Sequence, residues 1–309
     1  MKYILISLII FLSILSFAAE EKWGLVLSGG GAKGAYEIGA WKALLDLGYD
    51  FGGVYGTSVG AINSAAVAQG DVTKAVDLWK TLKDSEVMDM TPEVKQLLNE
   101  SGIKVLTDII KLPFKEIEEL GKKIVNQGII NIDPLKKTLN AALSEEIIRN
   151  SPVNMGLVTF DVTALKPKML YVEDIPQGQL IDYVAASGNF PLFVREKISG
   201  QDYMDGGVYY NMPIKMAVDK GFKNVVAIQI GGEHIGLFIN FVEKFKLKKY
   251  IHIKPRVIYG SVLDFSPENS SKMLVEGYLD TLYVHNYVSG DYTYIMEDTD
   301  VVKNMFTSL

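Results

Sequence analysis

The stretch WGLVLSGGGAKGAYEIG, from Trp23 to Gly39, decides the fold because it joins a short apolar run to a helical pattern through glycines. Trp23 to Leu27 has the length and composition of a buried strand. Ala35 to Leu47 carries apolar residues at helical spacing. Phe51 to Tyr55 and Val59 to Ala68 repeat the order of strand and helix. This alternation predicts an α/β fold with a parallel sheet between helices.

The glycine loop also has the spacing of a nucleotide-binding turn. Gly29, Gly31 and Gly34 fit G-x-G-x-x-G, and Lys33 lies among them. A dinucleotide site needs an acidic residue about 20 residues further on, at the end of the second strand. Asp50 instead precedes that strand. A Walker loop needs Ser or Thr after its lysine, and here Gly34 follows. Nucleotide binding remains the alternative from a different functional class.

A G-x-S-x-G pattern, Gly56 to Gly60, stands where the second strand ends and the next helix begins. This is the position of a nucleophile elbow. Gly56 and Gly60 relieve crowding in the turn. The turn exposes the Ser58 hydroxyl at the start of the helix, where the helix dipole and free N–H groups favour negative charge. The pattern predicts Ser58 as a catalytic nucleophile.

Acyl transfer through Ser58 generates an oxyanion, which needs preorganised N–H donors. Gly29, Gly30 and Gly31 follow the neighbouring strand and carry no side chains that would block their N–H groups. We therefore expect these three glycines to form an oxyanion hole. The alternative is a tight turn that serves packing only.

The serine needs a general base. The chain has three histidines, and only His234, which follows a strand end, has a plausible position. Asp205 is the better candidate, because Gly206 and Gly207 after it let the backbone approach a neighbour closely. Burial raises the pKa of a carboxyl group and makes it a stronger base. The same three residues alone are also typical of a hairpin turn.

Composition limits the classes of function. The 309 residues, 48% of them hydrophobic and 22% charged, suit one large or two modest domains with a sizeable core. The formal net charge of −6 gives no indication of nucleic-acid binding, which usually needs a basic surface. The absence of cysteine excludes disulfides, thiol catalysis and cysteine-ligated metals.

The N-terminus has the pattern of a secretory signal peptide. Lys2 precedes an uncharged, mostly apolar run from Tyr3 to Ala19, with small residues near its end. We expect a signal peptide at residues 1–19, a single domain at 20–309 and export to the periplasm, the envelope or the medium. The alternative is an uncleaved anchor, although a membrane span usually needs about 20 apolar residues.

Helical signals dominate from Val72 to about Leu143. We expect a helical insertion or cap at about residues 84–128, which either packs on the core or acts as a lid or lipid-contacting surface. Further elements are expected after it: strands at Asn154–Phe160, Met169–Val172, near Tyr203, Val225–Ile230 and Tyr250–Ile253, and a helix at Asn269–His285.

A group of basic residues lies among apolar ones late in the chain. This pattern is typical of a solvated face or of contact with anionic lipid head groups. We call it the basic cluster, and its members are Lys244, Lys246, Lys248, Lys249, Lys254 and Arg256.

Four motifs in order resemble those of the patatin-like phospholipases. They are the glycine loop Gly29–Gly34, the elbow Gly56–Gly60, the segment Ala186–Pro191, and Asp205–Gly207 followed by Asn211–Pro213. Each motif alone is a weak signal, but together they are specific. They span Leu25 to about Pro213, and the chain resembles a bacterial, exported member of that family.

The resemblance implies a three-layer α/β/α sandwich with a mainly parallel central sheet. It implies a Ser-Asp dyad, with Ser58 as nucleophile, Asp205 as base and Gly30 and Gly31 as oxyanion donors. Lys33 and Gly34 would then shape the loop. No metal and no cofactor are expected.

The implied activity is hydrolysis of fatty-acyl esters of phospholipids, of the phospholipase A or lysophospholipase type, with contact to a lipid surface. A neutral-lipid esterase or an acyltransferase on the same site stays open. These motifs predict no oligomeric state.

Overall fold

The computed structural model describes residues 21–90, 130–190, 193–231, 244 and 246–286. The expected signal peptide, most of the helical insertion and His234 lie outside these residues. None of the helices described is both long and apolar enough to cross a membrane.

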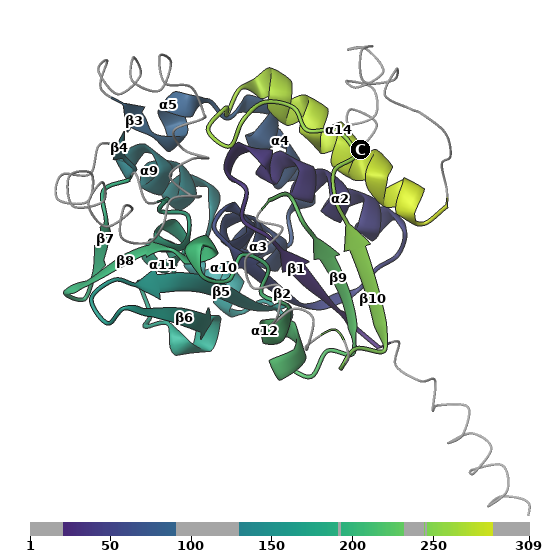
Figure 1. Ribbon diagram of the computed structural model, residues 1–309, viewed down its shortest axis with the longest axis horizontal. Helices are drawn as coiled ribbons and strands as arrows, with labels where there is room; N and C mark the ends of the chain where they lie inside the picture. Colours follow the sequence, from purple (N-terminus) through teal and green to yellow (C-terminus); the bar gives the residue numbers. More distant parts are fainter. Residues whose placement is uncertain (1–20, 91–129, 191–192, 232–243, 245, 287–309) are drawn as a thin grey trace, which may run out of the picture.

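A mixed, eight-stranded sheet forms the centre of the molecule, in the order β10-β9-β1-β2-β5-β8-β7, with β6 also paired to β5 (Figure 1). Strands β10, β9, β1, β2 and β5 run parallel, whereas β6 and β8 are antiparallel to β5, and β7 is antiparallel to β8. The strands are β1 (Trp23–Leu27), β2 (Phe51–Thr57), β5 (Asn154–Asp161), β6 (Lys166–Tyr171), β7 (Glu196–Ile198), β8 (Gln201–Asp205), β9 (Asn224–Ile228) and β10 (Lys249–Ile253). A separate two-stranded ladder joins β3 (Asp89–Met90) to β4 (Ile130–Asn131).

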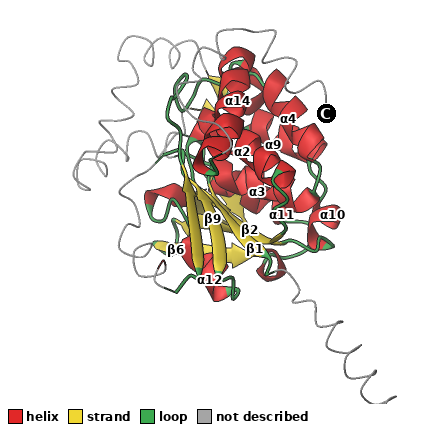
Figure 2. Ribbon diagram, turned by 90° about the vertical axis from the view of Figure 1, so that its right-hand side faces the viewer, coloured by secondary structure: helices red, strands yellow, loops and turns green. Residues whose placement is uncertain are grey.

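Helices cover the two faces of this sheet unequally. Figure 2 shows most of them gathered on one side, with α12 on the other. The helices are α2 (Gly34–Asp46), α3 (Val59–Gln69), α4 (Val72–Thr81), α5 (Asp84–Val87), α9 (Asp133–Ala142), α10 (Glu145–Arg149), α11 (Leu180–Ser187), α12 (Ile214–Asp219) and α14 (Pro267–Val284). The larger hydrophobic cluster lies under the many helices, and a smaller one around Tyr55, Tyr210 and Met216 lies on the α12 side. The predicted three-layer α/β/α architecture with a mainly parallel sheet is confirmed.

Helices α2 and α14 pack against each other with almost no side chain between them at two points. A Cβ atom on Gly39 would lie 1.8 Å from the Leu274 carbonyl oxygen, and one on Gly277 would lie 2.0 Å from the Tyr36 carbonyl oxygen. The Tyr36 hydroxyl also donates to the Asp280 carboxylate at 3.0 Å. This contact fixes α2, and α2 begins directly at the glycine loop.

Candidate active site

Two strands end head to head on the same edge of β5. Thr57, the last residue of β2, pairs with Val158 of β5, and Asp205, the last residue of β8, pairs with Thr159. Strand β6 occupies the opposite edge over this whole length, so β2 and β8 must share one edge. Because β2 runs parallel and β8 antiparallel to β5, the two strands approach each other from opposite directions (Figure 1), and this brings Ser58 close to Asp205.

Ser58 lies in a sharp turn with an unfavourable backbone conformation, φ 58° and ψ −130°. A positive φ is strained for a residue with a side chain, and such strain persists only where neighbours hold it. The Ser58 N–H donates to the Ser187 hydroxyl at 2.9 Å, and that hydroxyl donates to the Val158 carbonyl oxygen at 2.6 Å. Ser187 thus anchors the turn to β5.

The two elbow glycines leave no room for side chains. A Cβ on Gly56 would lie 2.0 Å from the Gly60 carbonyl oxygen, and one on Gly60 would lie 2.5 Å from the Leu27 carbonyl oxygen. The start of α3 therefore packs directly on the end of β1. This is the geometry that the G-x-S-x-G pattern predicts.

The Asp205 carboxylate is buried beside Ser58 and only 4% exposed. It accepts hydrogen bonds from the Ser58 side chain and from the Gly207 N–H, the latter at 2.7 Å. Burial raises the pKa of Asp205 from 3.8 to about 6, and both hydrogen bonds act in the opposite direction. A Cβ on Gly206 would lie 2.4 Å from the Val158 carbonyl oxygen, so only glycine lets this turn cross β5 so closely.

The glycine loop abuts the serine. A Cβ on Gly29 would lie 2.9 Å from the Ser58 Cβ. The Gly29 N–H is already bonded, since it donates to both the main-chain and side-chain oxygens of Asn211, at 3.2 and 3.1 Å. Within the described part of the chain, the N–H groups of Gly30 and Gly31 donate to no protein group. Of the three glycines, these two have N–H groups open to a ligand.

Asn211 is a site residue to which the sequence pattern assigned no role. Its amide nitrogen donates to the Gly29 carbonyl oxygen at 3.2 Å and to the Gly231 carbonyl oxygen at 2.8 Å. It therefore joins the segment after Asp205 to the glycine loop. The sequence signal for Asn211 was its position in the motif Asn211–Pro213, shortly after Asp205–Gly207. The spacing of these motifs does not reveal which loop the Asn211 amide contacts.

Lys33 and Gly34 link the loop to α2. Gly34 is packed so tightly that a Cβ there would lie 2.4 Å from the Val59 side chain. Partial burial lowers the pKa of Lys33. The described residues contain no group of acidic or histidine side chains suited to a metal ion.

The two described histidines are bonded elsewhere. His252 Nε2 lies 2.8 Å from the Gln229 side-chain oxygen, and His285 contacts the Tyr49 hydroxyl and the Thr281 carbonyl oxygen, each at 2.7 Å. His234 lies outside the described residues, so its exclusion as the base stays a prediction.

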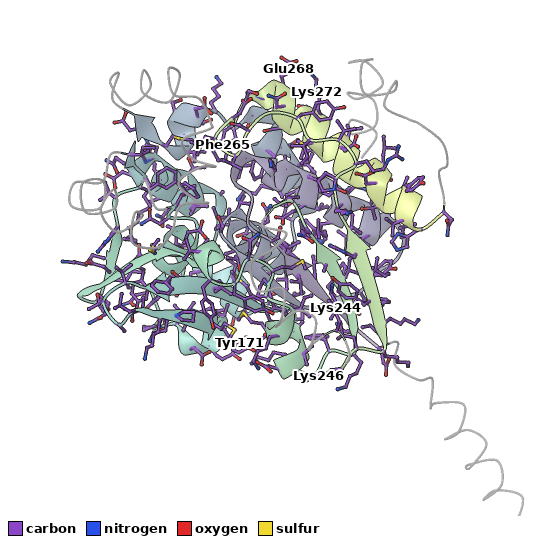
Figure 3. All side chains as sticks on the ribbon, viewed as in Figure 1. Tyr171, Lys244, Lys246, Phe265, Glu268 and Lys272 are labelled. Atoms are coloured by element: carbon purple, nitrogen blue, oxygen red, sulfur yellow. The ribbon has the colours of Figure 1, made fainter. Side chains whose placement is uncertain are left out.

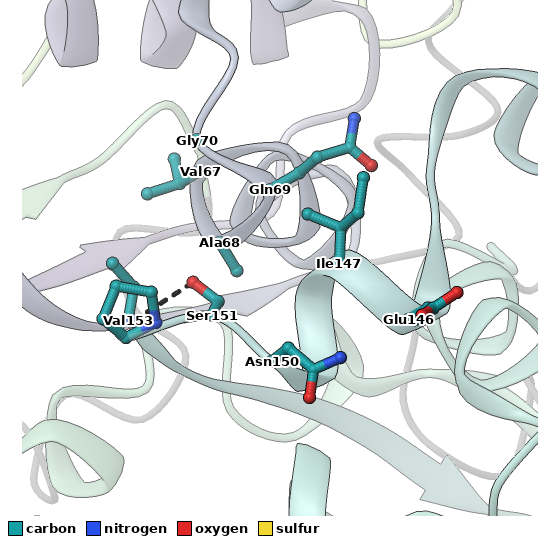
Figure 4. A pocket seen from close by; sticks show the side chains of 10 residues that line it. Val67, Ala68, Gln69, Gly70, Glu146, Ile147, Asn150, Ser151 and Val153 are labelled. Atoms are coloured by element: carbon teal, nitrogen blue, oxygen red, sulfur yellow. Dashed lines mark hydrogen bonds between the residues drawn. The ribbon is translucent and has the colours of Figure 1, made fainter.

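A surface cavity of about 420 Å³ lies at the far end of α3 (Figure 4). It is lined by residues around Val67, Gly70, Ile147 and Asn150. Helix α3 has 11 residues, which places this cavity about 16 Å along the helix from Ser58. The cavity is therefore separate from the serine and its neighbours.

The basic cluster does not form one face. Lys248 and Lys249 lie where β10 begins, whereas Lys254 and Arg256 follow its end, about 16 Å away. Two members, for example, already have partners: Lys248 forms an ion pair with Glu21 at 3.0 Å, and Lys249 lies over the Trp23 ring. Figure 3 shows Lys246 at the lower end of the molecule, near the start of β10.

Comparison with known proteins identifies related sequences. The model of the family described as patatin-like phospholipase matches residues 25–218. Patatin-like phospholipase domain-containing protein 7 of Rattus norvegicus is 29% identical over 211 residues, which cover 67% of this chain and 13% of that protein. Neuropathy target esterase sws of Drosophila melanogaster is 24% identical over 214 residues, 68% of this chain and 13% of that protein. This chain thus matches only a small part of each relative.

Among solved structures, VipD from Legionella pneumophila is similar with a TM-score of 0.52 and 17% identity. The similarity covers 87% of this chain and 67% of VipD. At this identity it supports the fold alone.

Proposed function

Because this chain belongs to the patatin-like phospholipase family, we propose that it is a serine acyl hydrolase that cleaves fatty-acyl esters through Ser58 and Asp205. The meeting of β2 and β8 on one edge of β5, which brings the Ser58 side chain beside the buried Asp205 carboxylate, carries this proposal. The open N–H groups of Gly30 and Gly31, in a loop that touches Ser58, support it further. Each of these residues lies inside the matched range.

In the first half of the reaction, the Asp205 carboxylate takes the Ser58 hydroxyl proton as the serine oxygen attacks the ester carbonyl carbon. The carbonyl oxygen becomes an oxyanion, which accepts hydrogen bonds from the Gly30 and Gly31 N–H groups. When the tetrahedral intermediate collapses, the bond to the leaving alcohol breaks. Asp205 returns its proton to that alcohol, and an acyl-enzyme remains.

In the second half, water attacks the acyl carbon and gives its proton to Asp205. Collapse of this second intermediate frees the fatty acid and returns the proton to the Ser58 oxygen. A carboxyl with a pKa of about 6 is ionised at neutral pH and is more basic than an ordinary aspartate, which suits both proton transfers.

We propose phospholipids as the substrate class, in keeping with the family description and the names of the relatives. Val208 and Tyr209 follow the Asp205 turn directly, and each is 46% exposed. They offer apolar contact to acyl chains at a lipid surface.

We also propose that the protein is exported, because residues 1–19 have the pattern of a signal peptide. A neutral-lipid ester differs in the leaving alcohol, and acyl transfer differs in the acceptor, so both remain candidates for the same site.

Labelling with a fluorophosphonate probe tests the nucleophile. We expect the probe to label the wild-type protein at Ser58, as identified by mass spectrometry of the modified peptide, and Ser58→Ala to abolish labelling. Ser151→Ala, in the separate cavity that also contacts the far end of α3, serves as the control and should label normally. Labelling that persists in Ser58→Ala would contradict the assignment.

Turnover assays test the base and the substrate. We expect Asp205→Asn to lose hydrolysis of p-nitrophenyl esters and His234→Ala to retain it. Mass spectrometry of products from phospholipid, triacylglycerol and acyl-acceptor mixtures then distinguishes the three chemistries. If the chain were instead a nucleotide-binding protein, NAD or ATP would raise its melting temperature, and we expect no such shift.

A further inference from the structure

A buried glutamate lies directly beneath the glycine loop. Glu37 is in the first turn of α2, and its side chain is fully buried. Its Oε2 accepts a hydrogen bond from the Asn63 side-chain nitrogen at 2.8 Å. Its Oε1 is also buried and has no hydrogen-bond partner among the described residues. An unsatisfied buried oxygen costs about 1–3 kcal/mol, so a purely structural position here would favour an apolar side chain.

Asn63 connects this glutamate to three helices. Its side-chain nitrogen also donates to the Gly34 carbonyl oxygen at 2.9 Å, and its side-chain oxygen accepts from the Trp79 indole N–H at 3.1 Å. The Trp79 ring fills the space beside Gly34, since a Cβ on Gly34 would lie 2.8 Å from it. Glu37, Asn63 and Trp79 therefore join the starts of α2 and α3 to α4.

The same carboxyl lies near both ends of the glycine loop. Gly34 ends the loop, and its carbonyl oxygen shares the Asn63 donor with Glu37. Ser28 begins the loop, and its N–H, which donates to the Ile228 carbonyl oxygen at 3.1 Å, also interacts favourably with the Glu37 carboxylate. Gly30 and Gly31 are in the middle of a loop whose two ends meet over one side chain.

We propose that Glu37, supported by Asn63 and Trp79, is a positioning residue that fixes the glycine loop so that the Gly30 and Gly31 N–H groups point at the oxyanion. This inference rests on the proposed function, because it assigns a task within that reaction. Glu37 touches no reacting atom. It acts through the two ends of the loop, so its loss should lower transition-state stabilisation more than substrate binding.

The choice of variants follows from the surroundings of Glu37. Burial raises its pKa well above the ordinary value, which favours the neutral carboxyl group. Glutamine has the same shape, keeps an oxygen to accept from Asn63 and should preserve the position. Leucine fills a similar volume without an acceptor. Glu276, a buried glutamate of a different helix, α14, provides the matched control.

We expect Glu37→Leu to lower kcat for a p-nitrophenyl ester by about tenfold to a hundredfold, with KM changed by less than about twofold, because small misplacements of catalytic groups have effects of this size. Glu37→Gln should keep kcat within about threefold of wild type. Glu276→Leu should change the melting temperature but not kcat per folded enzyme. Wild-type kcat in folded Glu37→Leu would overturn the proposal.

A double-mutant cycle tests whether Glu37 and Asn63 act as a unit. Asn63→Ala should lower kcat as Glu37→Leu does, and the double variant should lose little more than either single variant. If the two single losses in kcat multiplied in the double variant, Glu37 and Asn63 would act independently, which would contradict the proposal.

Hydrogen exchange separates failure of this inference from failure of the proposed function. If wild-type protein neither turns over esters nor labels at Ser58, the proposed function fails. Exchange over residues 28–34 then decides the inference by itself. Faster exchange in Glu37→Leu than in Glu37→Gln supports the positioning role, and equal exchange overturns it.

Discussion

At the scale of single residues, two opposing effects set the pKa of the Asp205 carboxyl group. Burial disfavours its charge, while hydrogen bonds from Ser58 and Gly207 favour it, and the pKa that results is about 6. A carboxyl group whose pKa is raised in this way can take a proton from serine more readily than an exposed aspartate. The pH dependence of this protein should therefore reflect one buried carboxyl.

The first prediction concerns the rate of hydrolysis. Asp205 must be ionised to act as base, so kcat/KM should rise with pH to a plateau, with an apparent pKa of about 6. Well below that value, the rate should fall about tenfold per pH unit. Steady-state hydrolysis of a p-nitrophenyl ester between about pH 4 and about pH 8 measures this. A profile that is flat across pH 6 would be inconsistent with Asp205 as the base.

The second prediction concerns stability. The pKa of Asp205 is higher in the folded chain than in the unfolded chain, so between about pH 4 and about pH 6 the folded state binds more protons. Burial of this carboxyl therefore costs stability as pH rises through that window. Asp205→Asn should be as stable as wild type at low pH and more stable by about 3 kcal/mol at pH 7.

Urea unfolding of the two proteins at several pH values measures this difference. Asp219→Asn, which removes an exposed ion pair with Lys215, is the control. Its stability relative to wild type should show no comparable dependence on pH. A stability difference between Asp205→Asn and wild type that does not change with pH would contradict the assigned shift.

At the scale of secondary-structure elements, the glycine loop depends on how α2 is held. Helix α2 is fixed on one side by Asn63 of α3 and on the other by the close backbone contact with α14. Gly39 and Gly277 make that contact possible, because each faces a backbone carbonyl oxygen of the other helix. The packing that holds the site thus extends to α14.

The third prediction follows from this contact. A methyl group at position 277 overlaps the Tyr36 carbonyl oxygen, so Gly277→Ala should force the helices apart. We expect a loss of about 2 kcal/mol in the free energy of unfolding, measured in urea, despite the better helix propensity of alanine. On the same helix, Lys272→Ala removes a partly exposed pair with Glu268 and a contact with the Tyr259 ring, and it should change stability by less than about 0.5 kcal/mol (Figure 3).

The elements that the sequence predicted best are the buried parallel strands. Apolar runs followed by glycine placed β1 at its observed residues and β2 within two residues of its observed end. The short helices α11 and α12 and the strand β7 were missed, because few residues and weak boundary signals leave no clear periodicity.

The sequence indicated which candidate residues to examine, but not how the strands bring them together. Ser58, Asp205 and the glycines follow from local motifs. That β2 and β8 meet on one edge of β5 is a long-range pairing, which no local pattern encodes. The same limit explains why the Gly29 N–H was expected to be open, although Asn211, which is distant in sequence, accepts its hydrogen bond.

At the scale of the whole molecule, different groups of residues lie at the two ends of the parallel strands. Glu21, Lys248 and Lys249 lie where β1 and β10 begin, whereas Ser58 and the glycine loop follow the ends of β2 and β1. The exposed Val208 and Tyr209 belong to the edge that carries Ser58. A lipid surface that delivers substrate should therefore meet the edge that carries Val208 and Tyr209, where the exposed Lys254 and Arg256 also follow the end of β10.

The fourth prediction tests that orientation. Tyr209→Ser should lower hydrolysis of phospholipid vesicles severalfold and leave hydrolysis of a soluble p-nitrophenyl ester unchanged, because only the former needs contact with a lipid surface. Lys248→Gln, at the other edge, should alter neither activity. Loss of vesicle hydrolysis in Lys248→Gln with full activity in Tyr209→Ser would reverse the proposed orientation.

The position of Glu21 has a practical consequence for immobilising this protein. Its side chain accepts hydrogen bonds from Asn224 and Lys248, at the starts of β9 and β10. Any linker joined at this residue therefore departs from the end of the strands opposite to Ser58. A protein shortened to begin at Glu21 and tethered there to a bead should present the edge that carries Ser58 outward and keep the turnover it has in free solution.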